Sequence, residues 1–315
     1  MNQPRASILV PTFRAATTLA ISVGSALRQT VSELEVIIVG DGVDPATRSV
    51  AESLVAGDER VRFFDLPKGE NRGELHRDLG VREAKSDAIV YLADDDILLP
   101  RHVENMIGML VDRMLVQSSN GYVSADGRLE LHPADLSDPT CIAWHLAEPP
   151  KNCVSITGTA HSRSSYLEIE AGWTVTPEGI WSDLYMWRKF FRRPDFRGAT
   201  HREMTTLQFP AEFHRNADPI KFVQTIARWD EFSRLADVQQ RMAAMLDEAE
   251  HRALVGLTMY SADLADELAT SLQMLETTVQ RFRSSMSWQV TAPVRAAGSL
   301  LRRVRRRTAT TDETA

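Results

Sequence analysis

Three consecutive carboxylates, Asp94-Asp95-Asp96, directly follow an apolar run at residues 88–92. Like charges this close together raise one another's pKa unless a positive charge offsets them. Mg²⁺ and Mn²⁺ favour one or two carboxylates together with phosphate oxygens. The triplet therefore predicts a divalent-cation site, for Mn²⁺ or Mg²⁺. An acidic turn at the end of a strand is the alternative interpretation.

The elements that must position this triplet alternate between strand and helix patterns along the first hundred residues. Short apolar runs at 7–10, 34–39, 61–66 and 88–92 predict strands. The segments 17–29, 45–56, 75–84 and 101–115 are predicted to be helices, the first with its apolar residues on one face. Such alternation indicates βαβ units, so the predicted fold class is α/β with a mainly parallel sheet flanked by helices.

Polar motifs follow three of the predicted strands. They are Pro11-Thr12-Phe13-Arg14, Gly40-Asp41-Gly42 and the Asp triplet. In an open parallel sheet, ligands bind beyond the carboxyl ends of the strands. We therefore expect the three motifs to lie on the same rim of the sheet.

Length, charge and cysteine content limit the classes of protein to which this chain can belong. The chain has 315 residues and a formal net charge of −7, which argues against nucleic acid as a partner. Two cysteines, Cys141 and Cys153, are too few for a disulfide framework, and a cytoplasmic protein with reduced thiols is expected. The sequence shows neither a secretory signal nor an apolar run of about 18 residues, so we expect no transmembrane helix.

The region after residue 218 differs in composition from the rest. Between Phe222 and Phe282 there is no proline, and Gly256 is the single glycine. Apolar residues at 257, 260, 264, 268, 272, 275, 279 and 282 follow in steps of three and four, as in a coiled coil. The predicted domains are 1–218, a helical extension at 219–285 and a tail at 286–315. The extension could form a helical hairpin against the first domain or a homo-oligomer.

The tail combines an apolar face with a cluster of arginines. From Pro293 onwards, apolar residues share one helical face, and six arginines occur at 295, 302, 303 and 305–307. A basic amphipathic segment on an acidic protein predicts peripheral contact with an anionic membrane surface, the inner face of the cytoplasmic membrane. A solvated tail without fixed structure is the alternative.

Several motifs occur together in a specific order. They are Val10 to Arg14, Glu35 to Gly42, Asn71-Arg72-Gly73 with His76 to Gly80, and the Asp triplet with Pro100. This series resembles the inverting family 2 glycosyltransferases of GT-A fold, over roughly residues 5–215. The resemblance implies transfer of a sugar from a nucleotide-sugar donor to an acceptor hydroxyl. The tail segment 287–295 is similar to an element of bacterial polysaccharide-assembly enzymes, which implies a glycan or lipid-linked acceptor.

The resemblance also assigns roles to residues on the predicted rim. Pro11 and Thr12 would line the pocket for the base and ribose. Asp41 lies in the nucleotide-binding turn, and Arg77 near the base or phosphates.

The Asp triplet receives the remaining donor-side roles. Asp94 and Asp95 would hold the ribose and diphosphate positions, and Asp96 would complete the metal site with Asp94. A metal there would act as a Lewis acid on the departing nucleoside diphosphate.

An inverting transfer needs a general base for the acceptor hydroxyl. The resemblance places this base at Asp183, at the start of a helix predicted over 181–191, where the residue could also act as a helix cap. His161 and Trp173 are the candidate acceptor residues, each with a structural role as the alternative.

The sequence departs from the family pattern at Gly40, Asp78, Ala93 and Ser182. These departures keep open a second function, a non-catalytic scaffold or nucleotide-sugar-binding protein with a degenerate transferase domain. A nucleotidyltransferase would carry a Gly-rich loop after the first strand, where this chain has Pro11-Thr12. A retaining or hydrolytic enzyme is a further alternative, although no second catalytic carboxylate is evident.

Overall fold

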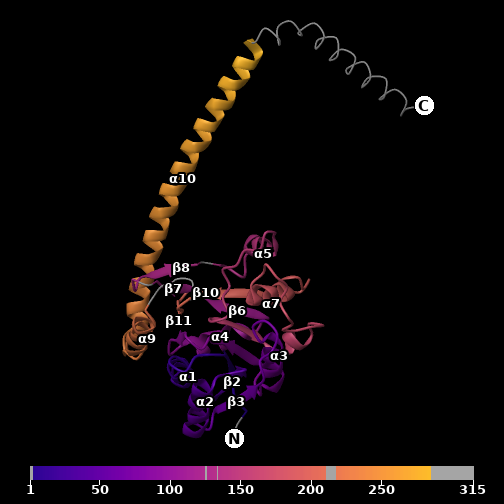
Figure 1. The fold of residues 1–315 in the computed structure, drawn as a ribbon, viewed down its shortest axis with the longest axis vertical. Coiled ribbons are helices and arrows are strands. Elements are labelled where there is room, and N and C mark those ends of the chain that lie inside the picture. The colour runs from indigo at the N-terminus through magenta and orange to yellow at the C-terminus, as the bar shows by residue number, and fades with distance from the viewer. Residues whose placement is uncertain (1–2, 125, 133, 211–217, 285–315) are drawn as a thin grey trace, which may run out of the picture. The chain divides into compact units, whose positions relative to one another are not determined.

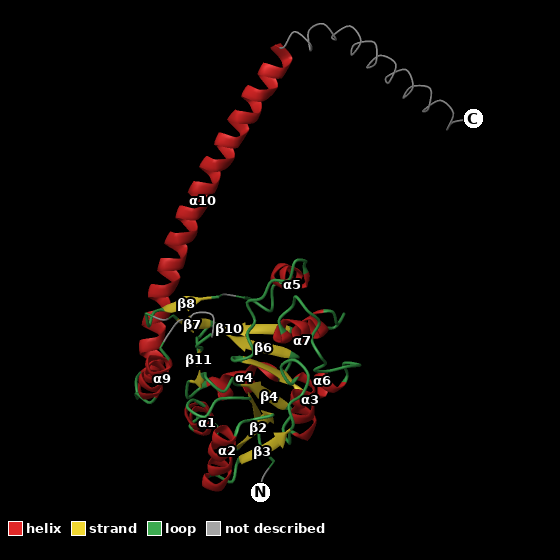
Figure 2. Ribbon diagram, viewed as in Figure 1, coloured by secondary structure: helices red, strands yellow, loops and turns green. Residues whose placement is uncertain are grey.

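The computed structural model describes residues 3–124, 126–132, 134–210 and 218–284. A seven-stranded sheet with the order β10-β6-β9-β4-β1-β2-β3 forms its centre (Figures 1 and 2). Helices cover both faces of the sheet, and a long helix follows at the C-terminal end. These features confirm the predicted fold class: α/β, with a mainly parallel sheet flanked by helices and a C-terminal helical extension.

The strands and helices have the following bounds. The strands are β1 (Ala6–Thr12), β2 (Leu34–Asp41), β3 (Val61–Leu66), β4 (Ala88–Tyr91), β5 (Ile97–Leu98), β6 (Leu115–Ser118), β7 (Gly121–Val123), β8 (Leu129–Leu131), β9 (Thr159–Ser162), β10 (Gly198–His201) and β11 (Thr206–Leu207). The helices are α1 (Leu19–Leu27), α2 (Pro45–Gly57), α3 (Glu74–Glu83), α4 (His102–Leu110), α5 (Pro139–Leu146), α6 (Arg163–Leu167), α7 (Ser182–Phe191), α9 (Pro219–Ser233) and α10 (Val238–Ser284).

The strand directions explain why the polar motifs meet. β1 pairs in parallel with β2 and β4, and β2 pairs in parallel with β3. β9 runs antiparallel to its neighbours β4 and β6, which makes the sheet mixed at that point. The carboxyl ends of β1, β2 and β4 therefore lie on one edge of the sheet, as expected.

Two apolar layers enclose the sheet. Alternate residues of each strand point to opposite faces, so Ile8 and Val36 pack toward α1, α2 and α4. Leu9 and Ile37 pack on the other face with residues of α3, α6 and α7. The strand and helix patterns of the first hundred residues thus lead to a core on both sides of β1 and β2.

A third apolar cluster joins the small sheets to the helices that follow. β5 pairs with β11, and β7 pairs with β8. Phe209, Ile226, Val238 and Met242 are buried together in this cluster. The first compact unit accordingly extends to His251, whereas the sequence analysis placed the boundary at residue 218. The apolar residues of α9 and of the start of α10 explain the difference, because they complete this core.

The second unit begins at Arg252 and contains the remainder of α10. The predicted helical extension at 219–285 contains two helices, α9 (Pro219–Ser233) and α10, and α10 runs without interruption from Val238 to Ser284. Within the part of the chain that the structure describes, no helix is both long and apolar enough to cross a bilayer. The predicted basic tail lies outside the described residues.

The buried strands predict a clear difference between two valines. Val36 of β2 is fully buried, whereas Val111 after α4 is 85% exposed. Val36→Ala should lower the free energy of unfolding by about 2 kcal/mol, through lost apolar burial and a cavity in the core. Val111→Ala should change it by less than about 0.5 kcal/mol. Chemical denaturation of both variants measures the difference, and equal effects would contradict the assignment of β2 to the core.

Candidate active site

The rim of the sheet carries a cavity of about 270 Å³. It lies beyond the carboxyl ends of β1, β2 and β4, where the three polar motifs end. Among its lining residues are the predicted donor-binding residues Pro11, Thr12, Asp41, Arg77 and Asp94. The structure thus brings together side chains from positions 11 to 94 of the sequence.

The Asp triplet lies in a turn directly after β4, and the pKa values of its carboxyl groups are raised. Burial raises the pKa of Asp94, although a hydrogen bond from the Phe13 amide opposes that shift. Burial and the negative charges of Asp96 and Asp94 raise the pKa of Asp95 well above its usual range. Within the described residues, the ion pairs include none of these three carboxylates. A cation at this turn would offset charge that the surrounding protein leaves unpaired.

Asp96 is the buried carboxylate at the end of the triplet. Its Oδ1 accepts a hydrogen bond from the Phe209 amide at 2.9 Å. Burial raises the pKa of Asp96 to about 6, while hydrogen bonds from Thr157 and Phe209 lower it. Phe209 follows β11, so a segment more than a hundred residues away fixes the carboxylate.

The donor set fits a hard divalent cation. In the described part of the chain, no group of three or more His, Cys, Asp or Glu side chains converges on a metal position. Mg²⁺ and Mn²⁺ need only one or two carboxylates when phosphate oxygens and water supply the other ligands. Two buried carboxylates with raised pKa values are compatible with such a site.

Asp41 is engaged within the protein at the end of β2. Its carboxylate accepts hydrogen bonds from Lys68 Nζ at 2.7 Å and from the Gly69 amide at 2.6 Å. Its neighbour Gly40 has no room for a side chain, because an added Cβ would lie 2.9 Å from the Phe63 ring. Asp41 therefore fixes the position of the loop after β3, including Lys68 at the wall of the cavity.

Arg77 of α3 connects the cavity to a second region. Arg77 is 9% exposed, and its guanidinium lies 4.9 Å from the Trp173 ring centroid and donates to Ser182 Oγ at 3.3 Å. Burial lowers the pKa of Arg77, but the carboxylates of Glu74 and Asp183 oppose that shift. An arginine stays protonated in proteins, so this is a buried positive charge.

Asp183 lies in the first turn of α7, next to Ser182. Its Oδ1 accepts hydrogen bonds from Asn152 Nδ2 at 3.2 Å and from the Leu184 amide at 2.7 Å. Burial raises the pKa of Asp183, while the Leu184 amide and the charge of Arg77 lower it. A carboxylate with a raised pKa in a partly buried position is suited to accept a proton.

A larger cavity of about 530 Å³ adjoins the first and shares Asn71 and Arg72 with it. The loop before α7 forms one wall, including Trp181, which is 50% exposed. Two lining residues, Glu74 and Thr176, each have a buried oxygen without a hydrogen-bond partner in the described residues. Such atoms cost stability unless a ligand or water satisfies them.

The acceptor role expected for His161 and Trp173 is not supported by their positions. His161 is fully buried and Trp173 is 2% exposed, so neither presents a ring to a bound molecule. Trp173 Nε1 donates to Tyr91 Oη at 2.7 Å, and Tyr91 Oη lies 2.8 Å from His161 Nε2. Both residues instead belong to a buried polar chain that supports β4 and Arg77.

The departure at Asp78 also has a structural basis. Tyr166 donates its hydroxyl hydrogen to Asp78 Oδ1 at 2.6 Å and accepts from the Trp173 amide at 2.7 Å. Arg82 donates to the other oxygen of Asp78 at 2.7 Å. Asp78 thus fixes the backbone of Trp173, on whose ring Arg77 rests.

Three contributing residues escaped the sequence analysis. Thr157 hydrogen-bonds Asp96 and the Ala93 amide, Asn152 contacts Asp183, and Lys68 contacts Asp41. Each acts across a long stretch of sequence, and no local pattern marks it.

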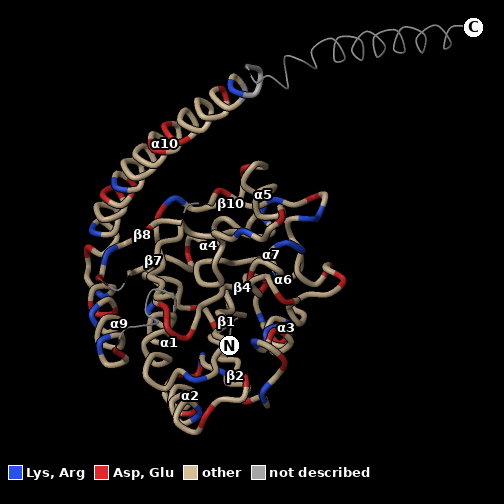
Figure 3. The backbone as a smooth tube through the Cα atoms, turned by 45° about the horizontal axis from the view of Figure 1, so that its top comes forward, with Lys and Arg blue, Asp and Glu red and all other residues tan. Residues whose placement is uncertain are grey.

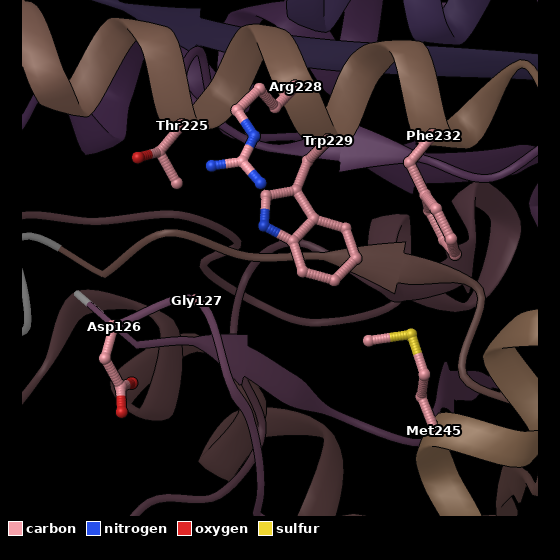
Figure 4. A pocket seen from close by; sticks show the side chains of 7 residues that line it. All are labelled: Asp126, Gly127, Thr225, Arg228, Trp229, Phe232 and Met245. Carbon is pink, nitrogen blue, oxygen red and sulfur yellow. The ribbon is translucent and has the colours of Figure 1, made fainter.

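A separate cavity of about 430 Å³ lies near the β7–β8 turn, against α9 and the start of α10 (Figure 4). Trp229, Phe232 and Met245 form its apolar wall. Its carboxylate, Asp126, pairs with Arg128 at 3.2 Å. None of the predicted site residues lines it, so we do not include it in the site.

The buried polar chain predicts a pH dependence of stability. Burial lowers the pKa of His161 to about 4, compared with about 6.5 in an unfolded chain. As the pH falls from about 6.5 to 4, the unfolded chain therefore takes up a proton that the folded protein excludes. The free energy of unfolding should decrease over that range, by at most about 3 kcal/mol from this residue.

His161→Gln should make the decrease smaller by this amount, because an amide does not titrate. His251→Gln on an exposed face of α10 should leave the slope unchanged. Urea unfolding at several pH values measures the slopes, and identical slopes for the wild type and His161→Gln would contradict the prediction.

Known proteins share parts of this sequence. Residues 7–160 match the family described as glycosyl transferase family 2. An uncharacterized glycosyltransferase of Haemophilus influenzae is 26% identical over 126 residues, 40% of this chain and 50% of that protein. A Campylobacter jejuni protein named GalNAc(5)-diNAcBac-PP-undecaprenol beta-1,3-glucosyltransferase is 29% identical over 96 residues, 30% of this chain and 31% of that one. The chondroitin synthase of Pasteurella multocida is 36% identical over 129 residues, 40% of this chain and 13% of that protein.

Solved structures show a weaker likeness. S. aureus TarS 1–349 has a TM-score of 0.49 at 12% identity, over 79% of this chain and 71% of that one. The mannosyltransferase PcManGT from Pyrobaculum calidifontis, in complex with GDP-Man and Mn²⁺, has a TM-score of 0.46 at 16% identity, over 84% and 81% of the two chains.

The sequence matches cover part of this chain and part of each relative. The chain spans half or less of the length of these curated relatives. The family match includes the Asp triplet and Arg77 and ends before Asp183. Residues 7–160, just under half of the chain, are therefore similar to glycosyl transferase family 2.

Proposed function

We propose that this protein transfers a sugar from a nucleoside-diphosphate sugar to an acceptor hydroxyl with inversion at the anomeric carbon. The observation that carries the proposal is the position of Arg77. It lines the cavity that Asp94 lines, and it donates to Ser182, the residue beside Asp183. Asp94 on the proposed donor side and Asp183, the candidate base, thus both interact with the buried positive charge of Arg77.

The donor side follows from the rim cavity. Pro11, Thr12 and Asp94 surround a space suited to a base and ribose, and Lys68 and Arg72 add positive charge for the diphosphate. A divalent cation, Mn²⁺ or Mg²⁺, held by Asp94 and Asp96 would stabilise the negative charge of the departing diphosphate. Asp95, in the middle of the triplet, would help to hold the ribose and diphosphate of the donor.

The acceptor side follows from Asp183. The carboxylate would take the proton of the acceptor hydroxyl as that oxygen attacks the anomeric carbon. Asn152 and the Leu184 amide fix its Oδ1, so the carboxylate keeps one orientation. Burial raises its pKa, while the Leu184 amide and the charge of Arg77 oppose that rise.

The larger cavity is the place for the acceptor. The ring of Trp181 is half exposed at its wall, and the buried oxygens of Glu74 and Thr176 lack partners there. An aromatic face and unpaired acceptors or donors suit a sugar ring with its hydroxyls. The name of the Campylobacter jejuni relative describes a lipid-linked saccharide acceptor, which favours a glycan or lipid-linked acceptor in polysaccharide synthesis.

The cellular setting stays a prediction from the sequence. A cytoplasmic location is expected from the two cysteines, and contact with the inner face of the membrane from the basic residues 295–307. This segment lies outside the described residues.

Binding of the donor nucleotide should depend on Asp96. One of UDP, GDP, dTDP or CDP should raise the melting temperature of the wild type in the presence of Mn²⁺, because a ligand that binds only the folded state stabilises it. Asp96→Asn should lose most of this increase. The exposed Asp112→Asn variant should keep it. A panel without any nucleotide-dependent increase would favour the degenerate scaffold as the function.

Asp183→Asn should separate binding from turnover. The amide cannot accept the acceptor proton, so kcat should fall on the order of 100-fold or more, while the donor-dependent increase in melting temperature stays. Asp195→Asn, an exposed carboxylate paired with Arg193, serves as the matched control. Nucleotide release from the identified donor, with an acceptor added, gives the rate. Unchanged turnover in Asp183→Asn would remove Asp183 from the mechanism.

A further inference from the structure

The second unit exposes a long apolar stripe on α10. Six large apolar side chains along it are between 43% and 66% exposed. They are Leu257, Tyr260, Leu264, Leu268, Leu272 and Leu275. A helix stays stable in water mainly by packing its apolar face, and a monomer seldom leaves a continuous stripe of this kind uncovered.

The stripe has an 11-residue repeat. Leu257, Leu268 and Val279 are 11 positions apart, and so are Leu264 and Leu275. Between these positions the repeat pairs one large residue with one small one. Tyr260 is next to Ser261, and eleven positions later Leu272 is next to Ser271. Eleven residues occupy about three helical turns, which is close to the natural period of an α-helix. Such a repeat keeps one face toward a partner with little supercoiling.

Charged residues are excluded from this stripe. From 253 to 282, none of the positions that belong to the repeat is Asp, Glu, Lys or Arg. The repeat positions are 253, 257, 260, 261, 264, 268, 271, 272, 275, 279 and 282. Long stretches without acidic or basic residues are visible along α10 in Figure 3. The pattern is that of an interface core and not of a solvated face.

We infer that the stripe pairs with the same stripe of a second copy of this chain. A repeat of 11 residues packs regularly only against a helix with the same spacing, and a second copy supplies identical layers. The segment from 252 to 284 is about 50 Å long at ~1.5 Å per residue, which is enough for several core layers.

The charges on the rest of the helix argue against a membrane as the occupant. Between residues 252 and 281 the acidic residues are Asp263, Asp266, Glu267 and Glu276, against Arg252 and Arg281. Helices that lie on anionic bilayers carry Lys and Arg on their polar face. This segment is net acidic, and it would be repelled from such a surface.

Sedimentation equilibrium of the full-length protein tests the pairing. The wild type should be a dimer at micromolar concentration. The double variant Leu264→Glu, Leu275→Glu should dissociate at least about 100-fold more readily, because two charges would enter the interface core in each copy. The control, Val255→Glu with Met259→Glu, changes two exposed apolar residues outside the repeat positions and should remain a dimer.

Thermal unfolding of each variant serves as the second measurement. The transition of the first compact unit should stay unchanged in both double variants, since the substituted residues lie beyond His251. A monomeric wild type at about 50 µM would overturn the inference, and so would a core variant that remains a dimer. A monomer that sediments with anionic vesicles, and loses this ability in the core variant, would identify a membrane as the occupant instead. None of these results depends on the proposed transferase activity.

Discussion

The site depends on one buried positive charge, the guanidinium of Arg77. It lies against the ring of Trp173 at 4.9 Å and donates to Ser182 at 3.3 Å. Burial raises the pKa of both Asp94 and Asp183, which belong to different parts of the sequence, and the charge of Arg77 opposes both shifts. Burial of a cation is costly unless nearby carboxylates and hydrogen-bond acceptors offset it. The carboxylates of Glu74 and Asp183 do so for Arg77, and in this way the rim of the sheet and the start of α7 form one electrostatic unit.

The charges near Asp183 differ from those near the Asp triplet. Asp183 interacts with the positive charge of Arg77, whereas Asp95 and Asp96 lie beyond β4 without an ion-pair partner in the described residues. A cation at the triplet would offset the negative charge of these carboxylates. The proposed donor complex supplies the cation together with the phosphate oxygens that it prefers. The departures from the family pattern at Gly40 and Asp78 leave this arrangement intact, because Gly40 makes room for Phe63 and Asp78 anchors Tyr166.

The two compact units contribute different properties. The first contains every residue that the proposed transfer needs, and its last core includes α9 and the start of α10. The second exposes a stripe of uncharged residues on α10, and the 11-residue repeat of this stripe includes no residue of the sheet. Pairing through this stripe would join two copies of the site in one particle without altering the residues that bind donor or acceptor.

The sequence by itself determined the α/β class, the strands of the rim and the motifs that end on it. Short apolar runs and turn residues are local signals, and the parallel order of β1, β2 and β4 makes their carboxyl ends meet. The repeat of α10 is equally local. Only the tertiary structure decided which side chains support the site. The contact of Phe209 with Asp96, that of Asn152 with Asp183 and the burial of His161 and Trp173 all join residues far apart along the chain. A pattern of neighbouring residues carries no information about such contacts, because they depend on how complete layers pack against one another.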